Sequence, residues 1–335
     1  MKYVFLTAFR NESSILRAFL DEFTAMVQKA GVADDAVLYM VDDLSMDRSA
    51  DILDAYSKRP GGFPLHVIRT PTNLGNQGAL FYGIARIDVA PDDVLVTFDC
   101  DGEDDVQQIP SVLEVWKKDP GKLVLIERGR RRESLRFKLL FRTYKAVFRF
   151  LTNKQVIPNN FMVIPGQLVP AIQRSPLVGV HFAYGILKLG APYAAETRDR
   201  RARYGGKTSQ NLFMLVSHGL VGLMVFYEVV LAKLFVLSFA VMGVAAALVA
   251  AGILLPPYLP WTDRTLLWLA IGLMIAASAG FGLLLASGLA IAFKLNVYFL
   301  TEVGAERRGE RRHLSEAASA ARRAARDGKS GTGSS

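Results

Sequence analysis

Short apolar runs alternate with longer amphipathic stretches along the first 127 residues of the chain. The short runs are typical of buried strands, and the longer stretches are typical of helices. The segments are, in order, 3–7, 15–30, 37–41, 49–58, 65–68, 78–87 and 94–98. Strands that alternate with helices predict an α/β domain with a mostly parallel sheet. Ligands bind at the carboxyl ends of the strands in such sheets, so we expect chemically active side chains there.

The pattern changes after residue 127. Residues 128–207 are basic and less regular, and they include a predicted helix over 135–151. From residue 208 to residue 233 apolar residues dominate, although three polar residues interrupt them: His218, Glu228 and Lys233. An interfacial helix over 208–233, lying among the headgroups of a membrane, fits this mixture. A core helix of a soluble domain is the alternative.

Two long blocks without a charged residue follow, at 234–255 and 265–293. At about 1.5 Å per residue, each block is long enough to cross a hydrocarbon core of about 30 Å. Lys and Arg are abundant on both outer flanks, whereas the turn between the blocks contains one basic residue. The two blocks therefore predict a two-helix transmembrane hairpin in the cytoplasmic membrane, and the positive-inside rule gives its orientation. It places the amino-terminal domain and a basic tail, 294–335, in the cytoplasm.

Composition agrees with a membrane protein, since 51% of the 335 residues are apolar, more than is usual for a soluble cytosolic enzyme. The predicted hairpin also carries small residues at four-residue spacing: Gly272, Ala276 and Gly280. Small residues allow close packing between membrane helices. A homo-oligomer and packing within one hairpin both fit this spacing.

The net charge of +9 is an average over opposite parts. Residues 1–116 contain 19 Asp and Glu against 9 Lys and Arg, whereas residues 117–149 contain 3 against 12. The chain therefore combines an acidic first third with basic segments, and we expect those segments to meet phosphate or an anionic membrane.

The sharpest chemical feature is Asp99-x-Asp101, directly after the predicted strand 94–98. Carboxylates two residues apart at a strand end can bind Mg²⁺ or Mn²⁺ and, through the metal, a diphosphate. Asp-x-Asp also occurs by chance in solvated loops. Two observations favour the metal site: acidic residues continue to Asp105, and a second acidic pair, Asp42-Asp43, ends the predicted strand 37–41.

Five segments in order resemble the motifs of the family 2 glycosyltransferases. They are Ala8-Phe-Arg-Asn-Glu12, Val41-Asp-Asp-Leu-Ser-Met-Asp47, Asn73-Leu-Gly75 with Ala79, Leu80 and Gly83, Asp99-Cys-Asp-Gly-Glu-Asp-Asp105, and Arg203-Tyr-Gly-Gly-Lys-Thr208. The sequence is similar in particular to the membrane-anchored branch that uses polyprenyl phosphates. It departs from the family where Ala8 replaces Pro, Leu44 replaces Gly, and Ser209 stands in place of Lys.

The resemblance implies a GT-A-like, metal-dependent catalytic domain over 1–207 that binds a nucleotide-sugar donor. The residues it implies for the donor nucleotide are Ala8, Glu12, Asp42, Asp43 and Asp99. Those implied for the metal are Asp99, Asp101 and Glu103, and those implied for catalysis are Asp99, Asp101 and Arg203.

The basic segment supplies candidates for an acceptor phosphate, because guanidinium groups pair well with phosphate oxygens. The candidates are Arg128, Arg131, Arg136, Arg200 and Lys207. A solvated or lipid-facing run of charges is the alternative for part of this set. Nucleic acid is a poor partner, since the aromatic residues here fall at helical spacing, as in a buried or membrane-facing stripe.

The acceptor is predicted from a missing group. Transfer to a hydroxyl needs a general base, and family members that act on hydroxyls usually place an Asp in the region that corresponds to 178–184. This chain has no carboxylate there, although His181 is present. A polyprenyl phosphate needs no base, so an inverting transfer to such a lipid at the cytoplasmic face is the favoured function. Transfer to a lipid hydroxyl such as diacylglycerol, or a non-catalytic membrane scaffold, remains the alternative.

Overall fold

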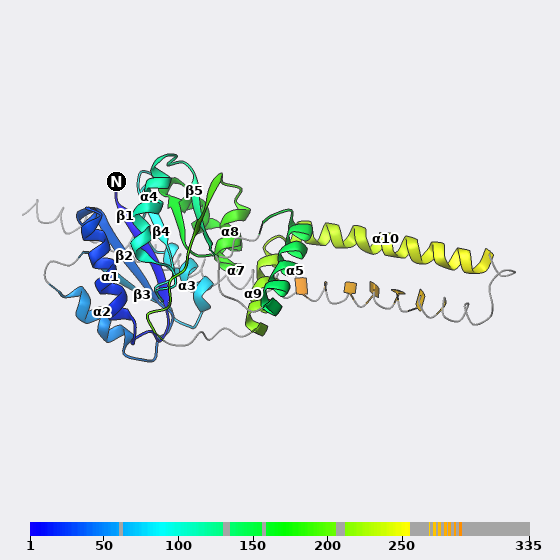
Figure 1. Ribbon diagram of the computed structural model, residues 1–335, viewed down its shortest axis with the longest axis horizontal. Helices are drawn as coiled ribbons and strands as arrows, with labels where there is room; N and C mark the ends of the chain where they lie inside the picture. The colour runs from blue at the N-terminus through cyan, green and yellow to red at the C-terminus, as the bar shows by residue number, and fades with distance from the viewer. Residues whose placement is uncertain are drawn as a thin grey trace, which may run out of the picture. The chain divides into compact units, whose positions relative to one another are not determined.

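Seven strands form one sheet in the described part of the computed structural model (Figure 1). The structure describes residues 1–59, 63–129, 135–155, 159–205 and 212–254, and individual residues between 268 and 289. The strands are β1 (Tyr3–Phe9), β2 (Ala36–Asp42), β3 (Leu65–Arg69), β4 (Val94–Thr97), β5 (Leu123–Arg128), β6 (Met162–Pro165) and β7 (Tyr193–Arg198). Their spatial order is β3-β2-β1-β4-β6-β5-β7. Only β6 runs antiparallel to its described neighbours, β4 and β5. The predicted α/β class with a mostly parallel sheet is therefore confirmed.

Helices connect the strands and continue beyond the sheet. They are α1 (Leu16–Lys29), α2 (Ser49–Ser57), α3 (Gly75–Ile84), α4 (Ile109–Lys117), α5 (Leu135–Thr152), α6 (Val169–Arg174), α7 (Pro176–Val180), α8 (Phe182–Lys188), α9 (Leu212–Met224) and α10 (Tyr227–Leu254). Short 3-10 turns, η1 (Ala33–Asp35), η2 (Val106–Gln108) and η3 (Gly166–Leu168), precede β2, α4 and α6.

The strand period of two divides the core between the faces of the sheet. On one face Phe5 packs with Phe23 of α1 in an edge-to-face pair whose ring centroids are 5.0 Å apart, and Trp116 of α4 belongs to the same cluster. On the other face α3 approaches β1 and β2 closely. A Cβ atom on Gly83 would lie only 2.5 Å from the side chain of Val41 and 2.9 Å from that of Leu6, so this helix contact requires a glycine.

A second, smaller core joins α5, α8, α9 and the start of α10. Phe148, Tyr184 and Phe226 are fully buried in it, and the rings of Phe148 and Tyr184 stack at 4.9 Å. At its rim, Lys188 forms an ion pair of 2.7 Å with Glu228. The stretch from Gly219 to Val230 is thus packed against α5 and α8.

The segment after residue 208 differs from the expected arrangement of one interfacial helix and one span. The helix breaks at Val225 and Phe226, which are buried in the second core. Helix α10 then continues without a break past residue 234, the predicted boundary between the interfacial helix and the first span. Burial of Phe226 explains the break between α9 and α10, because its ring packs edge-to-face on Phe148 at this point.

Within the described residues, no single helix is both long and apolar enough to cross a membrane. Val216–Met224 and Tyr227–Val241 pass by length and composition only as a pair, and the pair is bent by 93°. The block 265–293 falls largely outside the described residues, and 294–335 falls wholly outside them. The transmembrane hairpin accordingly stays a prediction.

Candidate active site

Three acidic strand ends meet at one edge of the sheet. In the parallel pairing of β1 with β2, Phe9 lies opposite Asp42, and in the pairing of β1 with β4, Leu6 lies opposite Thr97. Asp99 follows Thr97 by two residues, so it emerges at the same edge as Asp42 and the loop that contains Glu12. The fold therefore brings together the acidic residues expected to bind donor and metal.

Hydrogen bonds fasten the loop after β1 to the loop after β2. The Asn11 side-chain oxygen accepts from Met46 N at 2.8 Å, and the Asp47 carboxylate accepts from Ser13 N at 3.0 Å. Burial alone would raise the pKa of Asp47, but hydrogen bonds from Ser49 and Ser13 lower it to about 2. The ionised Asp47 carboxylate thus holds the loop that contains Glu12 near the strand ends.

Asp42 and Asp43 have different surroundings although both are buried. Asp42 accepts one backbone hydrogen bond, from Ser45 N at 2.8 Å. Asp43 accepts from Leu74 N at 2.7 Å, from Gly75 N at 2.8 Å and from the Thr70 hydroxyl at 3.1 Å. Asp43 therefore anchors the start of α3, a structural task that the sequence motif did not reveal.

The loop Asp99–Asp105, which we call the metal loop, carries the Asp-x-Asp pair. One Asp99 oxygen accepts from the amides of Asn76 at 3.1 Å and Asn160 at 3.2 Å. The Asp101 carboxylate accepts from Glu103 N at 2.9 Å. Burial, followed by the charge of Asp99, raises the pKa of Asp101. Burial is the larger cause of this rise, and repulsion from the Asp99 carboxylate adds to it.

The segment 199–204, which we call the arginine segment, lies on the metal loop. Its backbone reaches the loop through Arg201 N to Glu103 O at 3.2 Å and Tyr204 N to Asp101 O at 3.1 Å. The Tyr204 ring covers Gly102, whose φ is +89° and whose missing Cβ would lie 2.7 Å from that ring. Glycine is thus required at 102 on both counts.

Two arginines of this segment pair with predicted metal ligands. Arg203 contacts Asp101 at 3.4 Å and Glu12 at 3.2 Å, while Arg200 contacts Glu103 at 2.5 Å. Burial raises the pKa of Glu12, and Arg203 opposes that rise. The structure therefore places Arg203 between the residue expected to bind the nucleoside and one expected to bind the metal.

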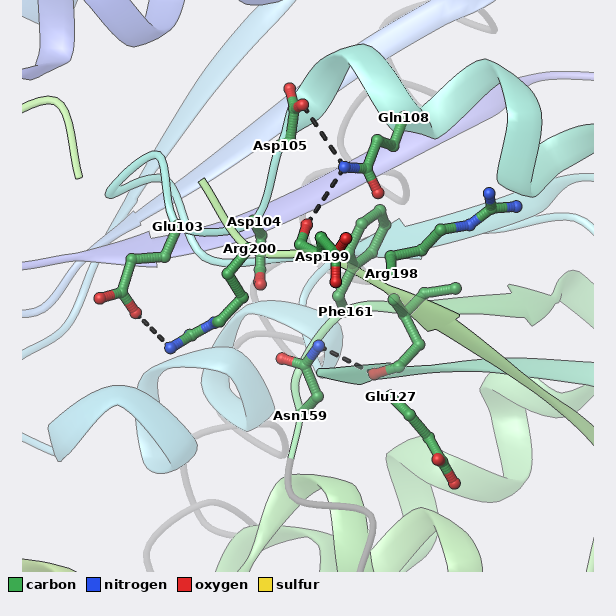
Figure 2. Close-up of a pocket in the computed structure, with 11 residues that line it drawn as sticks. Glu103, Asp104, Asp105, Gln108, Glu127, Asn159, Phe161, Arg198, Asp199 and Arg200 are labelled. Carbon is green, nitrogen blue, oxygen red and sulfur yellow. Dashed lines mark hydrogen bonds and ion pairs between the residues drawn. The ribbon is translucent and has the colours of Figure 1, made fainter. Parts of the chain in front are cut away.

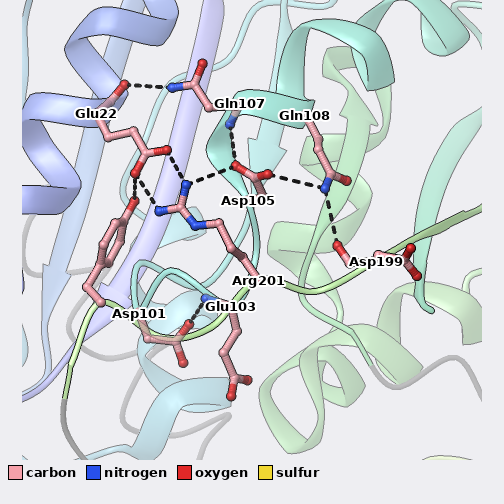
Figure 3. Close-up of polar contacts among 9 residues, drawn as sticks. Glu22, Asp101, Glu103, Asp105, Gln107, Gln108, Asp199 and Arg201 are labelled. Atoms are coloured by element: carbon pink, nitrogen blue, oxygen red, sulfur yellow. Dashed lines mark hydrogen bonds and ion pairs between the residues drawn. The ribbon is translucent and has the colours of Figure 1, made fainter. Parts of the chain in front are cut away.

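Arg201 faces the opposite way and fastens the segment to α1 (Figure 3). Its guanidinium donates to both carboxylate oxygens of Glu22, at 2.6 and 2.7 Å, and the Tyr204 hydroxyl donates to the same carboxylate at 2.7 Å. The hydrogen bonds from Arg201 lower the pKa of Glu22. No sequence motif pointed to Glu22, because its partner is 179 residues away.

A pocket adjoins the metal loop on the side of β5 (Figure 2). Its lining is Glu103, Asp104, Asp105, Gln108, Ile126, Glu127, Asn159, Phe161, Arg198, Asp199 and Arg200. Asn159 is 5% exposed and donates to Ile126 O at 2.9 Å, but its side-chain oxygen has no hydrogen-bond partner in the described part of the chain. The acidic edge thus continues past the metal loop into this pocket.

Several predicted residues lie elsewhere or outside the described set. Ala8 is buried in β1, where its carbonyl accepts from the Cys100 thiol at 3.7 Å. Arg131 and Lys207, together with the side chains of Arg128 and Arg136, lie outside the described residues. Of the acceptor-phosphate candidates, the structure therefore describes only the Arg200 side chain, on Glu103.

The predicted metal ligands suit a divalent cation only in part. No group of three His, Cys, Asp or Glu side chains is arranged for a metal among the described residues. Glu103 pairs with Arg200 at 2.5 Å and Asp101 contacts Arg203 at 3.4 Å, while the charges of Asp99 and Asp101 repel each other. Two carboxylate ligands suit Mg²⁺ or Mn²⁺, because these cations commonly take their remaining ligands from substrate phosphates and water. The pair therefore fits a cation shared with a diphosphate.

Comparison with known proteins assigns the acidic edge to a family. The sequence profile described as "Glycosyl transferase family 2" matches residues 5–169, a range that begins within β1 and ends just after β6. Residues 5–169 belong to glycosyl transferase family 2. Glu12, Asp42 and the metal loop all fall inside this family 2 domain, whereas the arginine segment follows it.

Two curated bacterial relatives share one name, undecaprenyl-phosphate 4-deoxy-4-formamido-L-arabinose transferase. The protein from Serratia proteamaculans is 30% identical over 105 residues, which are 31% of this chain and 30% of its own length. The protein from Pectobacterium atrosepticum is 29% identical over 146 residues, 44% of this chain and 42% of its own. The match thus spans less than half the length of either relative.

Solved structures of glycosyltransferases also resemble the chain. Glucosyl-3-phosphoglycerate synthase from Mycobacterium tuberculosis is 16% identical with a TM-score of 0.49, covering 68% of this chain and 78% of that chain. A mannosyltransferase from Pyrobaculum calidifontis is 13% identical with a TM-score of 0.42, covering 89% and 87%.

Proposed function

We propose that the protein transfers a sugar, with inversion, from a nucleotide-sugar donor to a polyprenyl phosphate at the cytoplasmic face of a membrane. One observation carries the proposal: Glu12, Asp42, Asp99 and Asp101 share one sheet edge, and Arg203 lies between two of them. Membership of residues 5–169 in glycosyl transferase family 2 supports sugar transfer. The names of the two curated relatives support a polyprenyl phosphate acceptor.

The donor would lie along the acidic edge. Asp99 and Asp101 would hold Mg²⁺ or Mn²⁺, which when bound neutralises the diphosphate of the donor. Asp42 and Glu12 would accept hydrogen bonds from the nucleoside. The Arg203 side chain is 24% exposed, so its guanidinium would also face a phosphate oxygen of the donor.

The acceptor is inferred from the state of His181, the candidate base for a hydroxyl. His181 is 1% exposed, and burial together with the nearby His218 lowers its pKa to about 3. An imidazole with so low a pKa is a poor proton acceptor, and its burial keeps a substrate hydroxyl away. A phosphate acceptor is already ionised near neutral pH. Its oxygen can attack the anomeric carbon as the bond to the diphosphate breaks, without a base.

Membrane attachment would bring the enzyme to its lipid substrate. Apolar side chains of α10 are largely exposed, including Phe235 at 65%, Val236 at 67% and Phe239 at 57%. Exposed apolar residues in such number on one helix favour a lipid or protein partner. We infer that α9 and α10, with the block 265–293, hold the family 2 domain at the cytoplasmic membrane.

A donor and acceptor screen tests the proposal. The full chain in detergent is incubated with radiolabelled UDP- and GDP-sugars, Mg²⁺ or Mn²⁺, and either undecaprenyl phosphate or diacylglycerol. We expect label in a lipid product that mild acid releases, formed only with undecaprenyl phosphate. Label only with diacylglycerol would contradict the phosphate acceptor. Absence of both product and calorimetric binding of any nucleotide sugar would support a non-catalytic scaffold instead.

Asp101→Asn serves as the matched control, because it removes a charge while retaining an oxygen that accepts from Glu103 N. We expect this variant to fold and to lose transfer. Full transfer by Asp101→Asn at saturating Mg²⁺ and Mn²⁺ would show that Asp101 does not bind the metal.

A further inference from the structure

A row of amide groups connects Asp99 with the start of α8. Phe182 N donates to the Gln77 side-chain oxygen at 2.9 Å, and Gln77 Nε2 donates to the Asn160 side-chain oxygen at 2.9 Å. Asn160 Nδ2 in turn donates to Asp99 Oδ1 at 3.2 Å. The row, which we call the amide relay, joins residues from α3, the loop before β6 and the start of α8. These residues lie far apart in the sequence.

The ends of the amide relay fix its direction. A backbone N–H can only donate, and an ionised carboxylate can only accept. Gln77 must therefore turn its oxygen to Phe182 and its nitrogen to Asn160, and Asn160 must turn its nitrogen to Asp99. Each hydrogen bond in the row points toward the carboxylate, so each member orients the next.

Asn160 has little freedom to move. Its side chain is buried, with 5% of the residue exposed, and its backbone carbonyl accepts from the Thr97 hydroxyl. Asn76 donates to the same Asp99 oxygen as Asn160, at 3.1 Å. Two donors on one oxygen fix the rotation of the carboxyl group about its last bond, and with it the direction in which the second oxygen points.

We propose that Asn160 is a positioning residue for the Asp99 carboxylate, and that Gln77 acts on that carboxylate through Asn160. The inference rests on the proposed function, in which Asp99 and Asp101 hold a divalent cation. Partners behind a metal ligand orient it, and their loss typically costs about 10- to 100-fold in metal affinity or activity. Cation affinity should therefore depend on Gln77, which hydrogen-bonds to neither acidic residue.

Mn²⁺ binding by the full chain in detergent, measured by calorimetry in the presence of saturating UDP or GDP, tests the relay. Asn160→Ala removes the donor to Asp99. Gln77→Glu keeps the size of the side chain and the oxygen that accepts from Phe182 N. It replaces the nitrogen that donates to Asn160 with a second oxygen, which can only accept. The Asn160 amide must then turn over and present its oxygen to Asp99. We expect each variant to bind Mn²⁺ about tenfold more weakly.

Gln173→Glu is the matched control. Gln173 is also a half-buried amide, and its Nε2 donates to Ile84 O at 2.8 Å and Ile87 O at 3.0 Å. It is not part of the relay, so Gln173→Glu should cost folding stability and leave Mn²⁺ affinity within about twofold of the unchanged protein, well short of a relay loss. Thermal unfolding measured alongside separates loss of fold from loss of positioning.

Each outcome decides between the two proposals. Weaker Mn²⁺ binding in both relay variants, with transfer restored at saturating Mn²⁺ and an unaffected control, supports the relay. Unchanged affinity in Asn160→Ala, or equal losses in Gln77→Glu and Gln173→Glu, overturns the relay and leaves the metal assignment standing. Absence of Mn²⁺ binding by the unchanged protein overturns the metal assignment together with the relay.

Discussion

Replacing Asp43 by Asn distinguishes a structural carboxylate from one that binds the donor. Asp43 accepts three hydrogen bonds, from Leu74 N, Gly75 N and the Thr70 hydroxyl, and it is 3% exposed. An Asn side chain has the same shape but only one accepting oxygen. Its nitrogen must therefore face at least one donor, whichever way the amide turns.

The expected loss follows from these contacts. One hydrogen bond to a charged acceptor, worth about 1.5–3 kcal/mol, is lost, and the others weaken because a neutral acceptor binds roughly half as strongly. A total of about 2–4 kcal/mol is a large part of the stability of a typical domain, about 5–15 kcal/mol. For a domain of this size it corresponds to a fall in unfolding temperature of about 5–15 °C.

The assay is thermal unfolding of the full chain in detergent, followed by tryptophan fluorescence, to which Trp116 in the sheet core contributes. Asp42→Asn is the matched comparison, since Asp42 accepts a single backbone hydrogen bond. We expect a smaller fall in temperature for Asp42→Asn and a larger loss of nucleotide-sugar affinity. If Asp43→Asn unfolds within about 2 °C of the unchanged protein, a shift smaller than a loss of about 1 kcal/mol produces, Asp43 does not anchor α3.

Three further changes test other parts of the site. Asp101→Asn should abolish Mn²⁺ binding yet raise the unfolding temperature of the metal-free protein, because burial raises the pKa of Asp101. That gain should grow as pH rises through the raised pKa and vanish in acid, where the carboxyl is protonated; a gain largest in acid would contradict it. Leu44→Gly should be about 1 kcal/mol more stable than Leu44→Ala in chemical denaturation, since φ at Leu44 is 58°. Glu22→Gln should loosen the arginine segment and raise the proteolysis rate at Arg201, whereas the exposed Glu114→Gln should not.

Much of the sheet and its helices follows from hydrophobic periodicity. The predicted strands 3–7, 37–41 and 65–68 coincide with β1, β2 and β3 because each is an apolar run between polar turns. Helix α3 begins three residues earlier than its apolar pattern, at Gly75, because Asp43 accepts the backbone N–H groups of Leu74 and Gly75. A hydrogen bond between residues 32 apart leaves no local pattern from which to read that start.

The last strands were not predicted. Strand β6 has four residues, and β7 alternates exposed and half-buried residues at the edge of the sheet. Strand β6 is too short, and β7 too exposed, to give a distinct period.

The candidate site was predicted as far as its acidic motifs reach. Asp99, Asp101 and Arg203 were placed together by motif order, and the structure brings Arg203 onto Asp101. Asn160 and Gln77 were missed because amide residues are common, and their meaning depends on a partner across the fold. The anchoring role of Asp43 was missed for the same reason. Asp42 and Asp43 are the same residue type, and only their tertiary contacts distinguish their roles.

The order in which the chain is synthesised gives the arginine segment a further consequence. The metal loop emerges from a ribosome about 100 residues before Arg200, Arg201 and Arg203, a delay of about 5–20 s at ordinary rates of translation. During that interval the nascent domain carries its acidic edge without the guanidinium groups that pair with Glu22, Glu103 and Asp101. These ion pairs can therefore form only after translation has passed residue 203.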